Sequence, residues 1–261
     1  MDPLTAAILL VFGVIAGIVG GFLGIGGCVI MLPALYFIFG YPLPMAIGTT
    51  ITAVIVTAVS GALGHIRIGN VDYNTAKLVA FSGALGAIIG SIIFYYIASN
   101  VKALSMVLGA AFIYVALRMI YEGAVRRRPE IRSGTQIPGS GTSKTLLGFF
   151  IGVLTGIIGL GGGYALVPSF IYIFEAPIKI SVGTSLASFI SMALISGSIK
   201  VYTGHADVIA AVFLGVGTAL GAQIGARLVP RVPGWAIKLI FGVVFLYVSV
   251  RFILSGLGIV I

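Results

Sequence analysis

The stretch GFLGIGGCVIMLP at residues 21–33 decides the fold, because it places four glycines within seven residues of an otherwise apolar segment. Glycine in a helix interior costs about 1 kcal/mol relative to alanine. A closely related stretch, GIIGLGGGYALVP, occurs at residues 156–168. The dense glycines predict, at both places, an unwound loop that is followed directly by the start of a helix.

The two stretches belong to a repeat that covers most of the chain. A shift of 135 positions aligns Gly26 with Gly161, and the motif Gly48-Thr49 with Gly183-Thr184. Because the Gly and Pro punctuation is preserved along with the apolar residues, we predict an internal duplication. The predicted organisation is a first membrane repeat at 1–121, a basic linker at 122–145 that is rich in Pro, Gly and Ser, and a second membrane repeat at 146–261.

Composition indicates a membrane protein. Of the 261 residues, 59% are hydrophobic and only 8% are charged, whereas charged residues make up about 25% of soluble domains. Charge-free runs at 4–34 and 209–226 are long enough to cross a hydrocarbon core, which takes about 20 helical residues. The N-terminus lacks the basic region of a signal peptide, so we expect a retained membrane helix there. The net charge of +9 lies mostly between apolar segments, so it does not indicate nucleic-acid binding.

The expected fold class is an all-α polytopic membrane protein with about five helical segments in each half. In the first half these are 4–21, 28–39, 43–63, 75–98 and 103–121. The second segment has about a dozen residues, or about 18 Å of helix. It is either a short crossing or a re-entrant half-helix, broken at the glycine loop.

Charge distribution discriminates between two topologies. If all five segments of each half cross the bilayer with the linker in the cytoplasm, the halves are inverted and both termini lie outside. Twelve of the 15 Lys and Arg residues then fall inside. If the first two segments form one crossing, the halves are parallel, with 10 of these residues inside and 5 outside. The positive-inside rule favours the inverted arrangement.

The glycine loops predict a binding site. Packing motifs place small residues four apart on a continuous helix, as Gly13 and Gly17 or Gly86 and Gly90 do, whereas the loop glycines are denser. A helix N-terminus carries unpaired N–H groups and about half a positive charge, so it attracts anions. Broken helices at matching places in two repeats are typical of a transporter's central site. Close packing alone is the alternative.

Hydroxyls that follow the Pro42 and Pro177 turns extend this candidate site, although such hydroxyls also bond back to their own helix. The candidate substrate-binding residues are therefore Gly24, Gly26, Gly27, Cys28, Thr49, Thr50, Gly159, Gly161, Gly162, Gly163, Thr184 and Ser185. Cys28 is the single cysteine, which excludes an internal disulfide, and it also suits a small packing position. We expect neither a metal nor a cofactor.

Three further polar residues are candidates for an anion path. His65 and Lys200 occupy equivalent positions, although a solvated side chain is the common outcome near a loop. Gln223 interrupts an apolar stretch. Asp72 and Asp207 are also equivalent, and we expect them to be N-caps of the fourth helix of each half.

This combination of two G-[IL]-G-G loops, two G-T-[ST] motifs, a basic linker and duplicated halves resembles the TauE/SafE family. The resemblance covers essentially the whole chain. It implies export of a small sulfur-containing anion, such as sulfite, thiosulfate or an organosulfonate, across the plasma membrane of a prokaryote. One departure is Cys28, where the second repeat has Gly163.

The residues fit an anion better than the rival functions. No carboxylate lies in the middle of an apolar segment, as a proton or cation relay would need. No His, Asp, Glu or Cys cluster indicates a membrane enzyme. Export of a dianion from a cell at about 150 mV, negative inside, is favoured by roughly 7 kcal/mol, so it needs no coupling ion. A passive anion channel of the same architecture is the alternative, and saturable exchange with trans-stimulation would distinguish a carrier from it.

Overall fold

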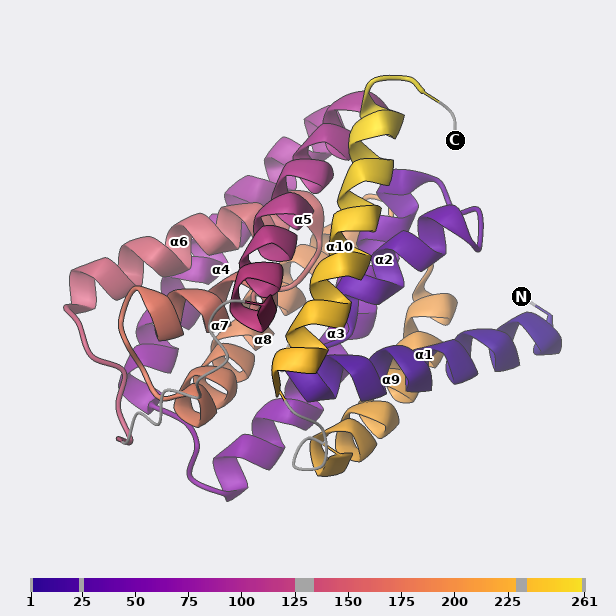
Figure 1. Ribbon diagram of the computed structural model, residues 1–261. Coiled ribbons are helices and arrows are strands. Elements are labelled where there is room, and N and C mark those ends of the chain that lie inside the picture. The colour runs from indigo at the N-terminus through magenta and orange to yellow at the C-terminus, as the bar shows by residue number, and fades with distance from the viewer. Residues whose placement is uncertain (1, 24–25, 125–133, 229–233, 260–261) are drawn as a thin grey trace. The chain divides into compact units, whose positions relative to one another are not determined.

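The computed structural model describes residues 2–23, 26–124, 134–228 and 234–259. Within these ranges the chain forms ten α-helices and no β-strand (Figure 1). The predicted all-α class is confirmed, and the helices end near the Gly and Pro residues that predicted their ends. In chain order they are α1 (Pro3–Leu23), α2 (Cys28–Phe37), α3 (Leu43–Arg67), α4 (Tyr73–Ile97), α5 (Val101–Ala124), α6 (Gly141–Ile158), α7 (Gly163–Tyr172), α8 (Ile178–Tyr202), α9 (Val208–Leu228) and α10 (Gly234–Gly256).

Two of the helices, α2 and α7, are much shorter than the others. Six helices of the described chain, α1, α3, α4, α5, α6 and α8, are long and apolar enough to cross a membrane. By contrast, α2 and α7 have 10 residues each, which is about 15 Å of helix and about half of a hydrocarbon core. The prediction of a short second segment in each half is confirmed for both halves.

The chain divides into two compact units, and each unit takes residues from both halves of the sequence. The first comprises Met1–Tyr95 and Ile131–Ala226, and the second comprises Tyr96–Glu130 and Arg227–Ile261. The second unit therefore consists mainly of α5 and α10, and the first contains the remaining helices. The predicted repeats at 1–121 and 146–261 are defined by similarity of sequence, whereas these two units are defined by which residues pack together, so the two divisions of the chain differ.

Glycines spaced four apart let helices of the first unit pack closely. Gly13 and Gly17 of α1 lie against the backbone of α9 at Leu214 and Thr218. In a second pair of helices, α4 and α6, Gly86 and Gly90 of α4 lie against the backbone of α6 in the same way. Such contacts between small residues hold membrane helices together by van der Waals packing. The packing interpretation of these spaced glycines is confirmed.

Helices α3 and α8, which are equivalent in the sequence repeat, run antiparallel to each other. Gly48, near the start of α3, lies against Lys200 and His205 at the end of α8. Thirteen residues later Gly61, near the end of α3, lies against Leu186 near the start of α8. The contact is also reciprocal, because Gly183 of α8 lies against His65 and Asn70.

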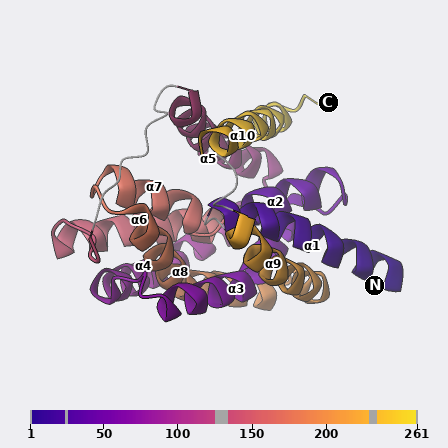
Figure 2. The same ribbon diagram turned by 60° about the horizontal axis from the view of Figure 1, so that its bottom comes forward.

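The second unit repeats this relation in α5 and α10. The two helices lie side by side in both ribbon views (Figures 1 and 2). Gly256 contacts Met106 near the start of α5, whereas Gly123, near the end of α5, contacts Trp235 near the start of α10. The helices are therefore antiparallel, like α3 and α8. Between them, Ser249 donates a hydrogen bond of 2.8 Å to the carbonyl oxygen of Gly109.

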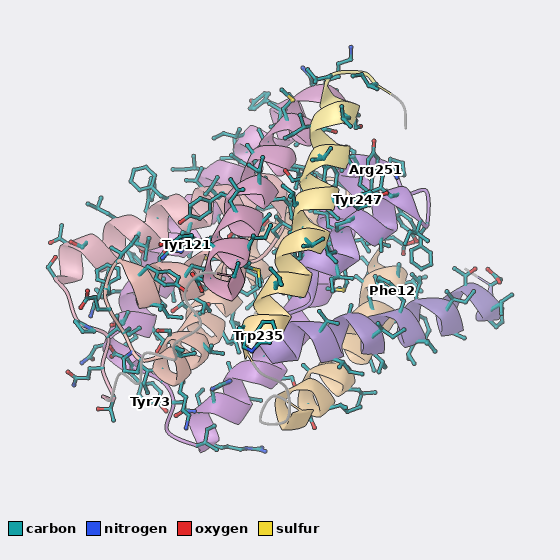
Figure 3. All side chains as sticks on the ribbon, in the orientation of Figure 1. Phe12, Tyr73, Tyr121, Trp235, Tyr247 and Arg251 are labelled. Atoms are coloured by element: carbon teal, nitrogen blue, oxygen red, sulfur yellow. The ribbon has the colours of Figure 1, made fainter. Side chains whose placement is uncertain are left out.

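Aromatic side chains stand at several helix ends. Tyr73 begins α4, Tyr121 lies in the last turn of α5, and Trp235 lies in the first turn of α10 (Figure 3). All three are exposed. Tyr and Trp concentrate at membrane–water interfaces, where an apolar ring meets a polar edge, so their places fit helices that end near the two membrane surfaces.

We predict that Gly13→Ala destabilises the protein. A Cβ atom there would lie 2.6 Å from the Leu214 carbonyl oxygen, so α1 and α9 would have to separate, at a cost of about 1–3 kcal/mol. Gly64→Ala is the matched control, because Gly64 is also inside a helix but nothing lies within 4 Å of its Cβ position. We expect the unfolding temperature in detergent to fall for the first variant and to stay equal or rise for the second. Equal behaviour of the two would contradict this packing.

Candidate functional site

Both glycine clusters form unwound loops between two helices. Gly26 and Gly27 have φ angles of 73° and 78°, and Gly159 and Gly161 have φ angles of 65° and 78°. These left-handed conformations are accessible to glycine but strained for other residues, so the glycines allow the chain to leave the first helix of each pair. The predicted helix breaks are confirmed. Gly24, the first glycine of the predicted site, lies outside the described residues.

The helices that follow the loops begin without side-chain caps. Helix α2 begins at Cys28 and α7 begins at Gly163, and neither has a hydrogen bond from a capping side chain. Both starts are buried. The first N–H groups of a helix have no partner within the helix, and together they carry about half a positive charge. Two buried helix starts, each with the positive end of a helix dipole, therefore lie in the first unit.

The two loops come together in space. The Cys28 thiol, at the start of α2, donates a hydrogen bond to the carbonyl oxygen of Leu160 in the second loop. Thus segments about 132 residues apart form one region of the fold.

The same region includes one face of α3 and one face of α8. Gly159 of the second loop contacts Ile47, while Gly26 of the first loop contacts Val54 and Thr57. These three α3 residues are spaced seven and three apart, so they lie on one face of the helix. On α8, Phe189 contacts both Gly161 and Gly162. The two glycine loops therefore pack on the long helices α3 and α8.

Thr50 and Ser185 lie on these two faces. Thr50 is three residues after Ile47 and four before Val54, and Ser185 is four residues before Phe189, so each shares the face that packs on a loop. Both are fully buried, and neither hydroxyl has a hydrogen-bond partner. A buried polar group without a partner is rare and calls for an explanation, such as a bound water or ligand.

Thr155 and Tyr164 flank the second loop and were missed by the sequence analysis. Thr155 lies in the last turn of α6 and Tyr164 in the first turn of α7. Both are buried and both side-chain hydroxyls lack a hydrogen-bond partner. Their positions beside the loop glycines could have identified them from the sequence. The equivalent residues of the first repeat are Gly20 and Val29, so a search for polar residues that match between the repeats does not find Thr155 and Tyr164.

Thr49 and Thr184, the other predicted hydroxyls, connect the two halves instead. The Thr49 hydroxyl accepts a hydrogen bond of 3.0 Å from the backbone N–H of Asp207. Reciprocally, the Thr184 hydroxyl accepts one of 2.9 Å from the backbone N–H of Asp72. Each Gly-Thr-(Thr/Ser) motif thus holds one hydroxyl in a contact between halves and one without a partner.

Asp72 and Asp207 cap α4 and α9, as predicted. The Asp72 carboxylate accepts the backbone N–H groups of Asn74 and Thr75, and the Asp207 carboxylate accepts that of Ala210. The remaining carboxylate oxygens have different partners. Asp207 accepts a hydrogen bond of 3.0 Å from the Tyr41 hydroxyl.

Asp72 also holds the end of the linker. Its carboxylate accepts the backbone N–H of Ile137 at 2.9 Å, and Lys144 donates to the Ile137 carbonyl oxygen at 2.5 Å and to the Thr75 hydroxyl at 2.9 Å. Burial alone would raise the pKa of Asp72. The hydrogen bonds from Thr75 and Ile137 and the charge of Lys144 outweigh that effect and leave the pKa below its ordinary value.

Lys200 is turned into the protein, although it lies only two residues from the end of α8. It is fully buried, and Nζ donates 2.5 Å to the carbonyl oxygen of Gly156 and 2.9 Å to the hydroxyl of Ser196. The expectation of a solvated lysine is therefore wrong. His65, its equivalent, is half-buried and its Nδ1 has no hydrogen-bond partner.

The remaining candidate residues differ in burial. Gln223 of α9 is exposed, so it is not part of the buried region around the loops. Among the described residues, no group of three His, Cys, Asp or Glu side chains is placed to hold a metal ion. The donors at the loops are hydroxyls and backbone N–H groups.

Comparison with known proteins places the chain in a family. A family model described as sulfite exporter TauE/SafE matches residues 9–252. The chain belongs to this family. It is 28% identical to the probable membrane transporter protein YunE of Bacillus subtilis, over 96% of this chain and 98% of that protein. It is 30% identical to a probable membrane transporter protein of Xylella fastidiosa, over 91% of each chain, and 25% identical to one of Methanocaldococcus jannaschii, over 92% and 94%. No solved structure matches significantly.

For this TauE/SafE family member we predict that Asp72→Asn lowers stability at neutral pH but not in acid. The folded-state pKa of Asp72 lies below the unfolded value of about 3.9, so its stabilisation is present above that value and is lost as pH falls through the folded pKa. In Asp72→Asn, the side-chain NH2 group would face the backbone N–H of Ile137, so that two donors would lie opposite each other. We expect a loss of about 1–2 kcal/mol at pH 7.

The measurement is the unfolding temperature in detergent from pH 3 to pH 7. The curves of the wild type and Asp72→Asn should approach each other below about pH 4. Glu175→Gln, at an exposed carboxylate, is the control and should follow the wild type throughout. A difference between wild type and Asp72→Asn that stays constant with pH would contradict the assigned charge state.

Proposed function

We propose that the protein exports a small sulfur-containing anion, sulfite or an organosulfonate, which binds between the two broken helices. Membership of the TauE/SafE family makes the protein a multi-pass membrane transporter. The anion, the direction of transport and the site are the further steps proposed here. Backbone N–H groups at the starts of α2 and α7, together with neighbouring hydroxyls, would be the ligand's hydrogen-bond donors.

One observation carries the proposal. Among the described residues, five buried hydroxyls have no hydrogen-bond partner. Four of them lie in or against the two broken-helix segments: Thr50, Thr155, Tyr164 and Ser185. The fifth, Ser105, lies on α5 in the second unit. Anions bound at the loops would supply the acceptors that these hydroxyls lack. Thr50 and Ser185 lie near opposite ends of the antiparallel pair α3 and α8, so they would contact different positions along the ligand path.

The charges near the loops favour an anion over a cation. The acidic residues that the structure describes (Asp2, Asp72, Glu122, Glu175 and Asp207) lie in turns, near the N-terminus or at helix ends. Lys200 is a buried cation that donates to the last turn of α6. Hydroxyls, N–H groups and an ammonium group are the donors that oxyanions require.

The helix directions support an inverted arrangement of the two halves. Helices that are equivalent in the repeat, α3 with α8 and α5 with α10, run antiparallel. If equivalent membrane helices point in opposite directions, the halves are related by an axis in the membrane plane. With the basic linker in the cytoplasm, both termini would then lie outside the plasma membrane of a prokaryotic cell.

The membrane potential favours export of an anion. A cell that is negative inside favours the exit of an anion by about 2.3 kcal/mol per charge per 100 mV. No coupling ion is needed for that direction. A passive anion channel with the same donors is the competing function, and counterflow of labelled sulfite that is stimulated by unlabelled sulfite on the other side would argue against it.

We predict that the purified protein binds sulfite and that Thr50→Val weakens the binding. Removal of one hydroxyl donor to an anion should raise Kd about tenfold. Ser185→Ala should have a similar effect, because Ser185 is the equivalent residue on α8. The measurement is titration calorimetry in detergent with sulfite, thiosulfate, methanesulfonate, sulfate and chloride.

Ser105→Ala is the matched control for both variants, because its hydroxyl is also buried and without a partner but belongs to the other unit. It should leave the affinity unchanged. The proposal fails if no sulfur oxyanion binds to the wild type, or if the three variants weaken the binding equally.

We also predict that cysteines introduced at the two ends of the chain react from outside the cell. In a Cys28→Ala background, a cysteine at Asp2 and another at Leu257 should both be labelled by a membrane-impermeant maleimide in intact cells. A cysteine at Ser140, at the end of the linker, should be labelled only after lysis. Labelling of Ser140→Cys in intact cells would overturn the inverted arrangement.

A further inference from the structure

Lys200 is a buried cation without a carboxylate partner. None of the described acidic residues forms an ion pair with it, since the pair that the described chain does form is Arg118 with Glu122. Lys200 is fully buried. A buried charge is costly unless it is compensated, and an ionisable residue inside a membrane helix marks a functional site by default.

Three contacts hold the Lys200 side chain. Its Nζ donates to the Gly156 carbonyl oxygen and the Ser196 hydroxyl, and it lies 4.4 Å from the centre of the Phe94 ring. In a continuous helix the Gly156 carbonyl would accept the N–H of residue 160. Because α6 ends at Ile158, that carbonyl needs another partner, and Lys200 supplies it.

The same contacts bring the charge to the second glycine loop. Gly156 directly follows Thr155, whose hydroxyl has no partner, and precedes the loop glycine Gly159 by three residues. From the side of α3, Gly48 packs against the Cβ of Lys200, and the adjacent Ile47 packs against Gly159. The ammonium group is thus bound to the last turn before the loop.

The first repeat has no such cation. The residue equivalent to Lys200 is His65, which is half-buried and has a free Nδ1. The two loops therefore differ in fixed charge, and the positive charge stands beside the second loop.

We infer that Lys200 is the fixed counter-charge of the anion site and that it sets the preference for ligand charge, so that a dianion gains more from it than a monoanion of the same shape. This inference rests on the proposed function, since it assigns a role within that anion site. The alternative is that Lys200 only tethers α8 to the end of α6 through the Gly156 carbonyl.

Three variants separate the two roles. Lys200→Arg keeps the positive charge. Lys200→Gln keeps a donor for the Gly156 carbonyl but removes the charge, and Lys200→Met removes both. Lys77→Met is the control, because Lys77 is an exposed lysine on α4. The probes are sulfate and methanesulfonate, which are both tetrahedral sulfur oxyanions but carry two charges and one.

Coulomb energy is proportional to the charge of the ligand, so a dianion loses about twice the interaction energy that a monoanion loses when Lys200 becomes neutral. The factor by which Kd rises for sulfate should therefore be roughly the square of the factor for methanesulfonate. If Lys200→Gln weakens methanesulfonate about tenfold, it should weaken sulfate about a hundredfold. Lys200→Met should behave like Lys200→Gln. For Lys200→Arg and Lys77→Met we expect affinities within about threefold of the wild type for both probes.

A second readout checks the charge without any ligand. Burial, and next to it the charge of Lys200, hold the pKa of His205 below its ordinary value, against a hydrogen bond with Thr203. Removing the charge should therefore raise the pKa of His205, measured by NMR in a His65→Gln background. Lys200→Gln should raise this pKa and Lys200→Arg should not.

The outcomes are distinct. Equal weakening of both probes in Lys200→Gln, or an unchanged pKa of His205, would leave Lys200 as a tether and overturn the inference while the anion site stands. If Lys200→Met does not fold, the comparison of Lys200→Gln with Lys200→Arg decides. Failure of the wild type to bind any sulfur oxyanion, sulfite included, would overturn the proposed function and this inference together.

Discussion

Backbone groups inside a bilayer must have partners in the protein or in a ligand, and the rest of this structure depends on that constraint. The chain breaks two helices at buried glycine loops, and each break releases carbonyl groups on one side and N–H groups on the other. At the second break, Lys200 and the N–H of Gly159 take carbonyls of α6. The N–H groups at the starts of α2 and α7 have no side-chain caps. In the proposed function, an anion would accept hydrogen bonds from these helix starts.

Glycine makes this arrangement possible in two separate ways. At Gly27 and Gly161 it allows left-handed backbone, so the helix can stop abruptly. At Gly13 and Gly86 it allows neighbouring helices to approach at backbone distance. The first use creates the loops, and the second fixes the helices that carry them. A rigid surround matters because the donors can be held in place only if the helices behind them do not move freely.

Much of this fold could be predicted from the sequence, because Gly and Pro mark helix ends in both repeats and membrane length limits the helices between them. The breaks before Cys28 and Gly163 and the caps at Asp72 and Asp207 follow from local chemistry alone. The orientation of Lys200 does not, since it depends on an acceptor 44 residues away at Gly156. Matching between repeats also misled in detail: it drew attention to Thr49 and Thr184, whose hydroxyls join the halves, and away from Thr155 and Tyr164, which have apolar counterparts.

The reciprocal contacts of Thr49 with Asp207 and Thr184 with Asp72 have a consequence for energetics. Each joins a threonine hydroxyl to the backbone N–H of an aspartate in the other half, at 3.0 and 2.9 Å. If the halves are inverted, these contacts close opposite ends of the same bundle, and identical halves would make the two closed ends equally stable. A difference in stability between the two ends would then come from residues that are not matched between the repeats. Within the described chain, the carboxylate of Asp207 accepts the hydroxyl of Tyr41 from beyond its own helix, whereas that of Asp72 accepts the linker N–H of Ile137. In an inverted arrangement, this linker contact would stabilise one closed end of the bundle differently from the other.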